Sequence, residues 1–246
     1  MHKFFVKTQD ISFNAITIAD IEGVHHAKNV LRLKEGASVS VSDSDENTYI
    51  CIIKKIYPGK LELEIKERLG KNAASRIRFS VACAIPKKSK MDDIIDKLTQ
   101  LGAERIIPLE TEHVIVKLDK DKKQLRRRRW EKIALGAARQ SQRSGCPEIT
   151  PITGFAALIS AKLDYDLKVI PTLEGKNTAL KEILDSNKPK NILVLIGPEG
   201  DFSREEVESA KNAGFIPVSL GNLVLRVETA AVAAASFIML NNYENH

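Results

Sequence analysis

Near its C-terminal end the chain has a glycine-containing loop of a kind that can bind a ligand. Gly197, Pro198, Glu199 and Gly200 directly follow the apolar run 192–196, which is typical of a central parallel strand. Glycines let the backbone approach a ligand closely, and a proline stiffens the loop. Because ligands of open α/β sheets sit at the carboxyl ends of strands, this loop is a candidate binding segment. A simple turn between a strand and a helix is the alternative.

A second loop, residues 220–230, joins apolar side chains to a charged end. Residues 223–225 are apolar and are followed by Arg226 and Glu228. Loops normally avoid apolar side chains, so we expect residues 223–225 to be buried and to form a ligand pocket with a polar edge. A salt bridge at the start of a helix, where the helix dipole favours Glu228, is the alternative.

The sequence has neither the standard nucleotide motifs nor the spacing of a metal site. Its thirteen glycines include no GxGxxG and no GxxxxGK(S/T), which disfavours a Rossmann-type dinucleotide site and a P-loop. The five histidines and three cysteines form no HExxH and no cluster of ligands, so we expect no metal. Scattered cysteines without a disulfide framework suit a reducing cytoplasm.

Length and composition describe a globular chain of one large domain or two modest ones. The chain has 246 residues, of which 43% are hydrophobic and 28% charged, a balance that excludes wholesale disorder. No apolar run approaches the ~20 residues that a membrane span needs, and the N-terminal residues do not resemble a signal peptide. We therefore expect a cytoplasmic protein with no membrane partner.

Basic residues are concentrated in one segment. The formal net charge is +6, and the excess of basic over acidic residues in 117–130 is as large as that of the whole chain. Four consecutive arginines, Arg126–Arg129, stand beside the only tryptophan, Trp130. Clustered arginines attract phosphate backbones, and arginine and tryptophan can both stack on unpaired bases. The segment favours RNA binding, and a solvated helix face is the alternative.

The elements that must position these residues fall into two parts, with a linker near residues 69–75. The first part, residues 1–72, begins with a short helix capped by Asp20 and then has the strand patterns and turn of a small barrel-like β domain. Its expected strands are at residues 37–41, 49–56 and 60–66, the last with strict alternation of apolar and polar residues.

The second part, residues 73–246, alternates strands and helices, which predicts an α/β domain with a mainly parallel sheet. We expect strands at residues 77–84, 105–109, 167–171, 192–196 and 215–220. We expect helices at residues 92–101, 120–144, 179–184, 204–213 and 229–240. Ser203 and Glu206 form a capping box at the start of the fourth of these helices.

Motifs along nearly the whole chain occur together at a specific spacing. They are His26–Arg32 (H-x-x-x-V-L-R), Lys97–Gly102 with Ile107–Leu109, Arg129-Trp130, Ala138–Arg143, Pro147, Ile196–Gly200 and Leu220–Ala230. In these motifs the chain resembles the SPOUT methyltransferases, and within them the RsmE type, which methylates a uridine of small-subunit ribosomal RNA at ring position N(3).

The resemblance implies a fold, a reaction and partners. The implied fold is a PUA-like RNA-binding β-barrel, residues 1–72, followed by a SPOUT domain, residues 73–246, whose C-terminal segment threads a trefoil knot. The implied reaction is methylation of a uridine at N(3) in 16S ribosomal RNA of the small subunit, with S-adenosylmethionine as cofactor. A homodimer is implied as well, with the cofactor site near the partner subunit.

With this reaction, roles can be assigned to residues. Arg226 is the candidate that stabilises negative charge on the uracil carbonyl oxygens, and Glu228 is a weaker candidate for proton acceptor. The cofactor-binding candidates are Leu173, Gly197, Pro198, Glu199, Gly200, Leu220, Gly221, Leu225 and Ala230. The RNA-binding candidates are Arg32, Arg126, Arg127, Arg128, Arg129, Gln140 and Arg143.

Three positions depart from the pattern of the family. Gln100 stands where relatives usually have Glu, and Arg139 stands where they often have Glu, which weakens any claim of a catalytic acid at either position. Asp201 follows Gly200 where relatives often have a third glycine, so it can alter the polar contacts of the cofactor loop.

Two other functions also fit the sequence. A non-catalytic RNA-binding factor of ribosome assembly would keep the barrel and the basic helix, but its pocket would not bind the cofactor. A SPOUT methyltransferase acting on transfer RNA would share the C-terminal loops, although the N-terminal barrel and the central motif 129–143 argue against it. Calorimetric titration with S-adenosylmethionine separates a pure RNA binder from an enzyme.

Overall fold

The structure is a computed structural model, and it describes residues 1–43, 47–71, 77–86, 90–112, 119–141, 143, 145–173, 175 and 177–243. Residues 72–75 of the expected linker and 117–118 of the basic segment lie outside the described residues. The chain forms two compact units, Met1–Ala74 with Ala138–Cys146 and Ser75–Ala137 with Pro147–His246. Within the described ranges, none of the helices has the length and apolar character that crossing a bilayer requires.

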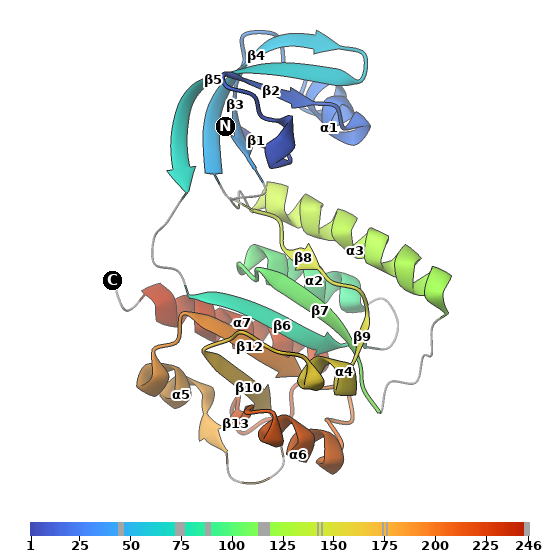
Figure 1. Cartoon of the computed structure of the whole chain (residues 1–246), viewed down its shortest axis with the longest axis vertical. Coiled ribbons are helices and arrows are strands. Elements are labelled where there is room, and N and C mark those ends of the chain that lie inside the picture. Colours follow the sequence, from blue (N-terminus) through green and yellow to red (C-terminus); the bar gives the residue numbers. More distant parts are fainter. Residues whose placement is uncertain are drawn as a thin grey trace. The chain divides into compact units, whose positions relative to one another are not determined.

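The first unit is built on a five-stranded sheet with the order β1-β3-β4-β5-β2. β1 pairs with β3 in parallel, and the other neighbours are antiparallel. Its elements are β1 (His2–Phe5), the 3-10 helix η1 (Thr8–Asp10), β2 (Ala15–Ile18), α1 (Ile21–His25), the π-helical turn η2 (His26–Val30), β3 (Ser38–Ser42), β4 (Asn47–Tyr57) and β5 (Lys60–Lys71) (Figure 1). The three strands predicted for this part are confirmed, and β1 and β2 are additional.

Alternation of apolar and polar residues turns one face of β5 into the core of the first unit. Leu61, Leu63 and Ile65 are all buried in that core, as their spacing predicts. The predicted helix start is confirmed too, because the carboxylate of Asp20 accepts a hydrogen bond from Gly23 N at 2.8 Å.

The second unit alternates strands and helices. Its elements are β6 (Arg78–Ala84), α2 (Lys90–Gln100), β7 (Arg105–Glu110), α3 (Lys120–Gln140), β8 (Glu148–Ile149), β9 (Thr153–Gly154), α4 (Phe155–Ser160), β10 (Leu167–Pro171), β11 (Thr178–Ala179), α5 (Leu180–Asn187), β12 (Asn191–Ile196), α6 (Arg204–Asn212), β13 (Ile216–Ser219) and α7 (Val227–Tyr243). The sheet has the order β11-β13-β10-β12-β6-β7-β8, and β9 also pairs with β7. Its strand pairs are parallel, so the predicted α/β fold with a mainly parallel sheet is confirmed.

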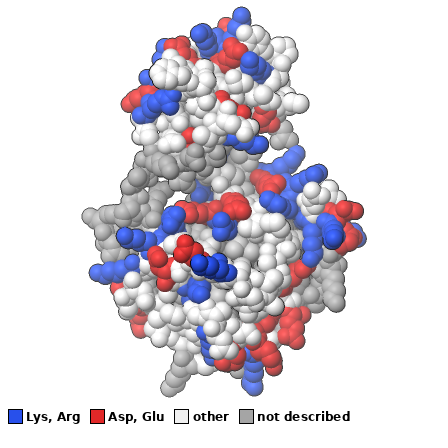
Figure 2. Space-filling view, viewed as in Figure 1, with Lys and Arg blue, Asp and Glu red and all other residues white. Residues whose placement is uncertain are grey.

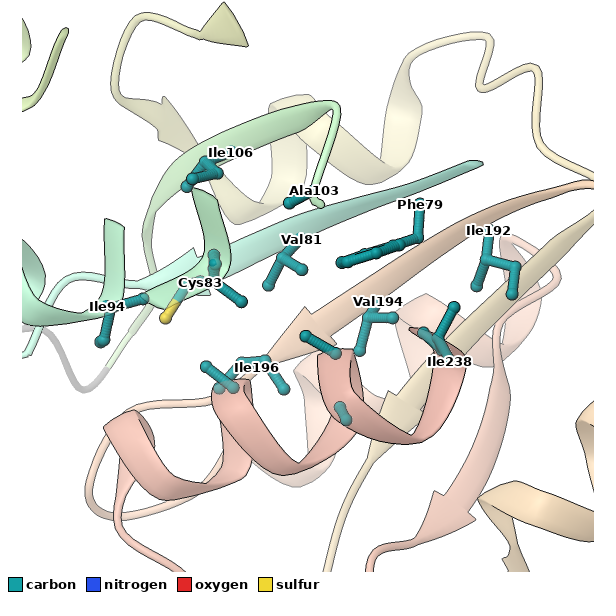
Figure 3. Packing of buried hydrophobic residues seen from close by; sticks show 14 of the residues in the cluster. Phe79, Val81, Cys83, Ile94, Ala103, Ile106, Ile192, Val194, Ile196 and Ile238 are labelled. Atoms are coloured by element: carbon teal, nitrogen blue, oxygen red, sulfur yellow. The ribbon is translucent and has the colours of Figure 1, made fainter. Parts of the chain in front are cut away.

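This sheet has a hydrophobic core on each face, because its central strands are buried on both sides. Along β12, Ile192, Val194 and Ile196 belong to one core, whereas Leu193 and Leu195 belong to the other. Helices α2, α5 and α7 contribute to the first core, and α4 and α6 contribute to the second. Figure 3 shows the first core, where side chains of β6 and β12 meet those of α2 and α7.

The structure differs from the sequence prediction at short elements and at one helix end. The pattern did not predict α4 or the strands β8, β9 and β11, each of two residues. The helix expected over 120–144 ends at Gln140. Just beyond it, Arg143 N donates to Ala138 O at 3.1 Å, a backbone bond of the kind that closes a helix C-terminus.

Candidate functional site

Three neighbouring strands of the second unit end at one edge of the sheet. β13, β10 and β12 lie side by side and run in parallel, so the loops that follow them come together. A pocket of about 620 Å³, counted with its open mouth, lies between these loops. Its lining comes from residues 171–173 after β10, from 196–199 and Asp201 after β12, and from the segment 219–230 between β13 and the start of α7.

The loop after β12 is tightly built. A Cβ added to Gly197 would lie 3.1 Å from the ring of Phe202 and 3.2 Å from Asp201 Oδ1, so a larger residue would require these side chains to move by a few tenths of an ångström. Asp201 has a φ of +61°, in the left-handed region that glycine adopts most easily. Ser203 Oγ accepts from Glu206 N at 3.2 Å, and Glu206 Oε2 accepts from Ser203 N at 3.0 Å. The predicted capping box is therefore confirmed.

The loop after β13 is open to solvent. Leu223 and Val224 line the pocket but are 76% and 77% exposed, so the expectation that they are buried is wrong. Leu225 is half-buried, and Val227, which begins α7, is buried. The loop belongs to no helix or strand, so the pocket is bounded on this side by apolar side chains with one face in water. Such a wall is suited to be covered by a ligand or by another chain.

Most of the predicted cofactor residues lie in this pocket. Leu173, Gly197, Pro198, Glu199, Leu220, Gly221, Leu225 and Ala230 line it. Gly200 is exposed and is not part of the lining. Thr172 and Ser219 are polar lining residues that the sequence did not single out. The only sequence signal for them is their place at the carboxyl ends of predicted strands.

The two predicted catalytic residues lie beside the pocket lining. Arg226 is exposed and stands between the lining residues Leu225 and Val227. Glu228 lies in the first turn of α7, and its Oε1 accepts a hydrogen bond from Lys90 Nζ at 2.9 Å. This hydrogen bond, opposed by partial burial, holds the pKa of Glu228 below its ordinary value. The Oε2 atom is buried and has no partner among the described residues.

Glu228 thus forms an ion pair at the start of a helix, which the sequence predicted as the alternative to a ligand pocket with a polar edge. A carboxylate with a lowered pKa is a weaker base, so the pairing with Lys90 reduces its ability to accept a proton. No local pattern links the two residues, because they are 138 positions apart in the sequence.

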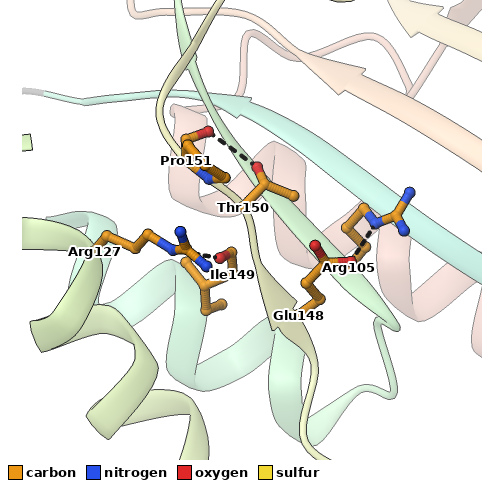
Figure 4. A network of polar contacts seen from close by, with 6 residues as sticks. All are labelled: Arg105, Arg127, Glu148, Ile149, Thr150 and Pro151. Atoms are coloured by element: carbon orange, nitrogen blue, oxygen red, sulfur yellow. Dashed lines mark hydrogen bonds and ion pairs between the residues drawn. The ribbon is translucent and has the colours of Figure 1, made fainter. Parts of the chain in front are cut away.

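The arginine cluster of α3 is partly committed to contacts within the protein. Figure 2 shows Lys and Arg side chains gathered over α3, with acidic side chains among them. Arg127 Nε lies 2.9 Å from Glu131 Oε1 and donates to Ile149 O at 3.0 Å (Figure 4). Arg129 pairs with Asp92 of α2. Through Ile149 and Asp92, two of the four arginines therefore help to hold α3 against other elements of the second unit.

The other two arginines are available to a ligand. Arg126 is half-buried and Arg128 is exposed, and neither pairs with an acidic residue in the described part of the chain. Trp130 is 2% exposed and donates from Nε1 to Asp92 Oδ1 at 3.1 Å. The expectation that Trp130 stacks on a base is wrong, because the tryptophan faces the core.

The remaining RNA-binding candidates belong to the first unit. Arg32 and Gln140 are exposed, and Arg143 is half-buried. The arginine cluster Arg126–Arg129 belongs to the second unit. Within the described ranges, no three His, Cys, Asp or Glu side chains come together in a way that could hold a metal ion.

Two of the three departures from the family pattern, Gln100 and Arg139, contact acidic side chains. Gln100 donates to Asp96 Oδ2 at 2.8 Å on the exposed side of α2. An Arg139 guanidinium nitrogen lies 3.9 Å from Oδ2 of Asp20, the residue that caps α1. Neither position holds an acid, and both side chains interact with acidic neighbours instead.

Two family models match the chain, one for each part of it. A model described as an RNA methyltransferase domain matches residues 73–239. A model described as an RNA methyltransferase PUA domain matches residues 18–66. The chain is also 31% identical to the ribosomal RNA small subunit methyltransferase E of Bacillus subtilis over 245 residues, which cover 97% of this chain and 96% of that protein.

Two solved structures with bound S-adenosylmethionine resemble this fold. A ribosomal RNA small subunit methyltransferase E from Neisseria gonorrhoeae superposes with a TM-score of 0.85 at 25% identity, covering 98% of each chain. A Legionella pneumophila protein superposes with a TM-score of 0.84 at 27% identity, covering 97% of each chain. With the family models and the fold in agreement, the chain belongs to the RNA methyltransferase family and carries both the methyltransferase domain and the PUA domain of that family.

Proposed function

We propose that the protein transfers a methyl group from S-adenosylmethionine to N(3) of a uridine in 16S ribosomal RNA. The observation that carries this proposal is the pocket at the ends of β10, β12 and β13, formed by the same loops that hold the family motifs. Near full-length similarity to small-subunit ribosomal RNA methyltransferases supports the choice of substrate. It favours this substrate over transfer RNA.

The chemistry of the pocket fits the cofactor. It is open to solvent on one side and is lined mostly by apolar side chains with a few polar groups, as ligand pockets commonly are. Leu173, Leu220, Leu225 and Ala230 offer apolar walls to an adenine ring. The irregular loop 220–226 offers backbone amide and carbonyl groups that belong to no strand or helix, and these groups can bind the polar edge of an adenosine.

The residues beside the pocket can act on the uracil. When bound, S-adenosylmethionine supplies a methyl group attached to a positively charged sulfur atom. The uracil N(3) carries a weakly acidic proton and becomes a good nucleophile only when the proton is lost. Arg226 would favour the resulting negative charge on the flanking carbonyl oxygens. Glu228 is the weaker candidate for proton acceptor, because Lys90 lowers its pKa.

RNA binding would involve both parts of the chain. We assign residues 1–72 to a PUA-like RNA-binding domain and residues 73–246 to the SPOUT methyltransferase domain. Arg32, Gln140 and Arg143 in the first unit would contact RNA, together with Arg126 and Arg128 on α3. Arg127 and Arg129 contribute positive charge, although each is also paired with an acidic side chain.

The active form would be a homodimer whose C-terminal segment is knotted. The family motifs at residues 196–200 and 220–230 lie in two of the segments that converge on the pocket, and the resemblance to knotted SPOUT enzymes supports a threaded C-terminal segment. Exposed apolar side chains on the loop after β13 and on α7 offer a surface for a second copy. Ribosomal RNA is assembled into subunits in the cytoplasm, so we place the reaction there, on the small subunit or its precursor.

Deletion of the gene tests the proposed function directly. Mass-spectrometric mapping of 16S ribosomal RNA should show that one methylated uridine is lost, and expression of the wild-type chain should restore it. Expression of the Arg226→Ala variant should restore it to a smaller extent. An unchanged methylation map in the deletion strain would reject the activity, and a chain that binds RNA but gives no calorimetric heat with S-adenosylmethionine would be a non-catalytic factor.

A further inference from the structure

One carboxylate joins two of the loops that form the pocket. Asp201 follows the glycine loop of β12, and its Oδ2 accepts hydrogen bonds from Thr172 Oγ1 at 3.1 Å and from Leu173 N at 3.0 Å. Its Oδ1 accepts from Phe202 N at 2.8 Å. Thr172, Leu173 and Asp201 all line the pocket. The two carboxylate oxygens therefore connect the loop after β10 to the loop after β12.

The backbone at this position would suit glycine better than aspartate. Asp201 has a φ of +61°, where a side chain strains the backbone and glycine does not. A glycine would provide no acceptor for the two groups on the loop after β10. Aspartate at this position strains the backbone. Its charged carboxylate accepts hydrogen bonds, however, and these are stronger than hydrogen bonds between neutral groups.

The bridge adds to the contacts that hold Thr172, whose backbone N donates to Val218 O at 3.2 Å and whose O accepts from Asn177 Nδ2 at 3.1 Å. Leu173 lies in an irregular stretch between β10 and β11, and its side chain is exposed. A side chain that must meet a ligand from such a loop needs its backbone to be fixed. The hydrogen bond at Leu173 N fixes the backbone at the residue that forms one wall of the pocket.

We propose that Asp201 is a positioning residue for the cofactor, because it fixes the loop carrying Leu173 against the loop carrying Gly197. This inference rests on the proposed function and deepens it by naming what holds two walls of the site together. Asp201 acts through the loop after β10. Its loss should weaken cofactor binding without unfolding the domain.

The test is calorimetric titration of the full-length Asp201→Gly variant with S-adenosylhomocysteine, the demethylated form of the cofactor. The dissociation constant should rise about tenfold, as the loss of hydrogen bonds to a charged group predicts. The melting temperature should change little, because glycine also relieves the strained φ. Thr172→Val removes one donor and should raise the dissociation constant by a smaller factor.

Asp166 offers a matched control in the same domain. Its Oδ2 also accepts from two backbone amides, Lys190 N and Asn191 N, both at 2.9 Å, but none of these residues lines the pocket. Asp166→Gly should lower the melting temperature and leave the dissociation constant for S-adenosylhomocysteine unchanged. If both variants weaken binding equally, general destabilisation explains the result and the inference is overturned.

Amide hydrogen exchange gives a readout that does not depend on the ligand. The amide of Leu173 should exchange faster in Asp201→Gly than in the wild type, whereas that of Asn191 should not. If Asp201→Gly binds S-adenosylhomocysteine as tightly as the wild type and its Leu173 amide exchanges at the wild-type rate, the inference is overturned but the proposed function is not. Failure of the wild-type chain to bind S-adenosylhomocysteine would overturn the proposed function as well, so the two failures are distinguishable.

Discussion

Arg226 is not part of the pocket lining, but it lies beside the pocket, where its positive charge can act on a base. It is exposed, and the residues on either side of it line the pocket. Arg226→Ala should lower turnover on the order of 100-fold, as removal of one group that stabilises developing negative charge typically does. The dissociation constant for S-adenosylhomocysteine should change little. Single-turnover methylation and calorimetry measure the two quantities.

A conservative replacement separates charge from shape at this position. Arg226→Lys keeps the positive charge and should retain part of the rate that the alanine variant loses. Normal turnover in Arg226→Ala would remove the residue from the reaction. A large loss of cofactor affinity in that variant would instead assign Arg226 to the cofactor site.

The ion pair between Glu228 and Lys90 should make stability depend on pH. The pKa of Glu228 is lowered from its ordinary value of 4.5, chiefly by the hydrogen bond from Lys90. A lowered folded-state pKa means that the pair stabilises the protein above pH 4.5 and loses this contribution as the pH falls through the folded-state value. Because both side chains are partly exposed, the contribution should be at most about 1 kcal/mol.

Calorimetric melting of Glu228→Gln measures this contribution. The variant should melt below the wild type at pH 7, and the difference should shrink as the pH falls below 4.5. Lys90→Gln should show the same trend, and the double variant should cost little more than either single one. A difference in melting temperature that stays constant down to pH 3 would show that the pair does not cause it.

At the scale of elements, α3 combines a structural face and a face open to solvent. Arg128 is exposed, whereas Arg127 is held by Glu131 and by the backbone of Ile149. Arg128→Gln should weaken RNA binding and reduce the slope of log affinity against log salt by up to about 0.9 if it neutralises one phosphate. Filter binding or fluorescence anisotropy at several salt concentrations measures the slope.

Arg127→Gln is the matched control, because it removes the same charge from a residue held by the protein. It should lower the melting temperature more than Arg128→Gln and change the salt slope less. If the slope of log affinity against log salt is the same in the wild type and in Arg128→Gln, this face of α3 is a solvated surface that does not bind RNA.

The elements that could be predicted are those whose own sequence carries a strong pattern. β12 is an unbroken apolar run because it is buried on both faces, and β5 alternates because one face is exposed. The two-residue strands β8, β9 and β11 are too short to have a period. On α3, the many charged residues obscure the apolar pattern of the buried face. The sequence therefore did not predict that Trp130 is buried.

The same distinction holds for the site. The loops around Gly197 and Leu225 could be predicted because each is marked locally, by glycines or by apolar residues where a loop should be polar. The pairings of Lys90 with Glu228 and of Asp201 with Thr172 could not be predicted, because tertiary packing brings together residues that are far apart in the sequence.

At the scale of the whole molecule, α7 has two apolar sides. Ala231, Ala234, Ala235 and Ile238 are fully buried against the sheet. A second stripe at helical spacing runs through Ala230, Ala233, Phe237 and Leu240, of which Phe237 is 45% and Leu240 54% exposed. A helix that is apolar on its outer side is suited to a partner, and we propose that a second copy of the chain covers it.

Because Ala230 belongs both to this stripe and to the pocket lining, dimer formation and cofactor binding should be coupled. Phe237→Glu places a charge in the proposed interface, so sedimentation should show a monomer where the wild type is a dimer. Its dissociation constant for S-adenosylhomocysteine should rise with the loss of the partner. Leu125→Glu is the control, because it changes a leucine that is 63% exposed on α3. It should alter neither the oligomeric state in sedimentation nor the dissociation constant for S-adenosylhomocysteine. A wild-type monomer, or a Phe237→Glu variant that remains a dimer, would show that this face of α7 does not form the interface.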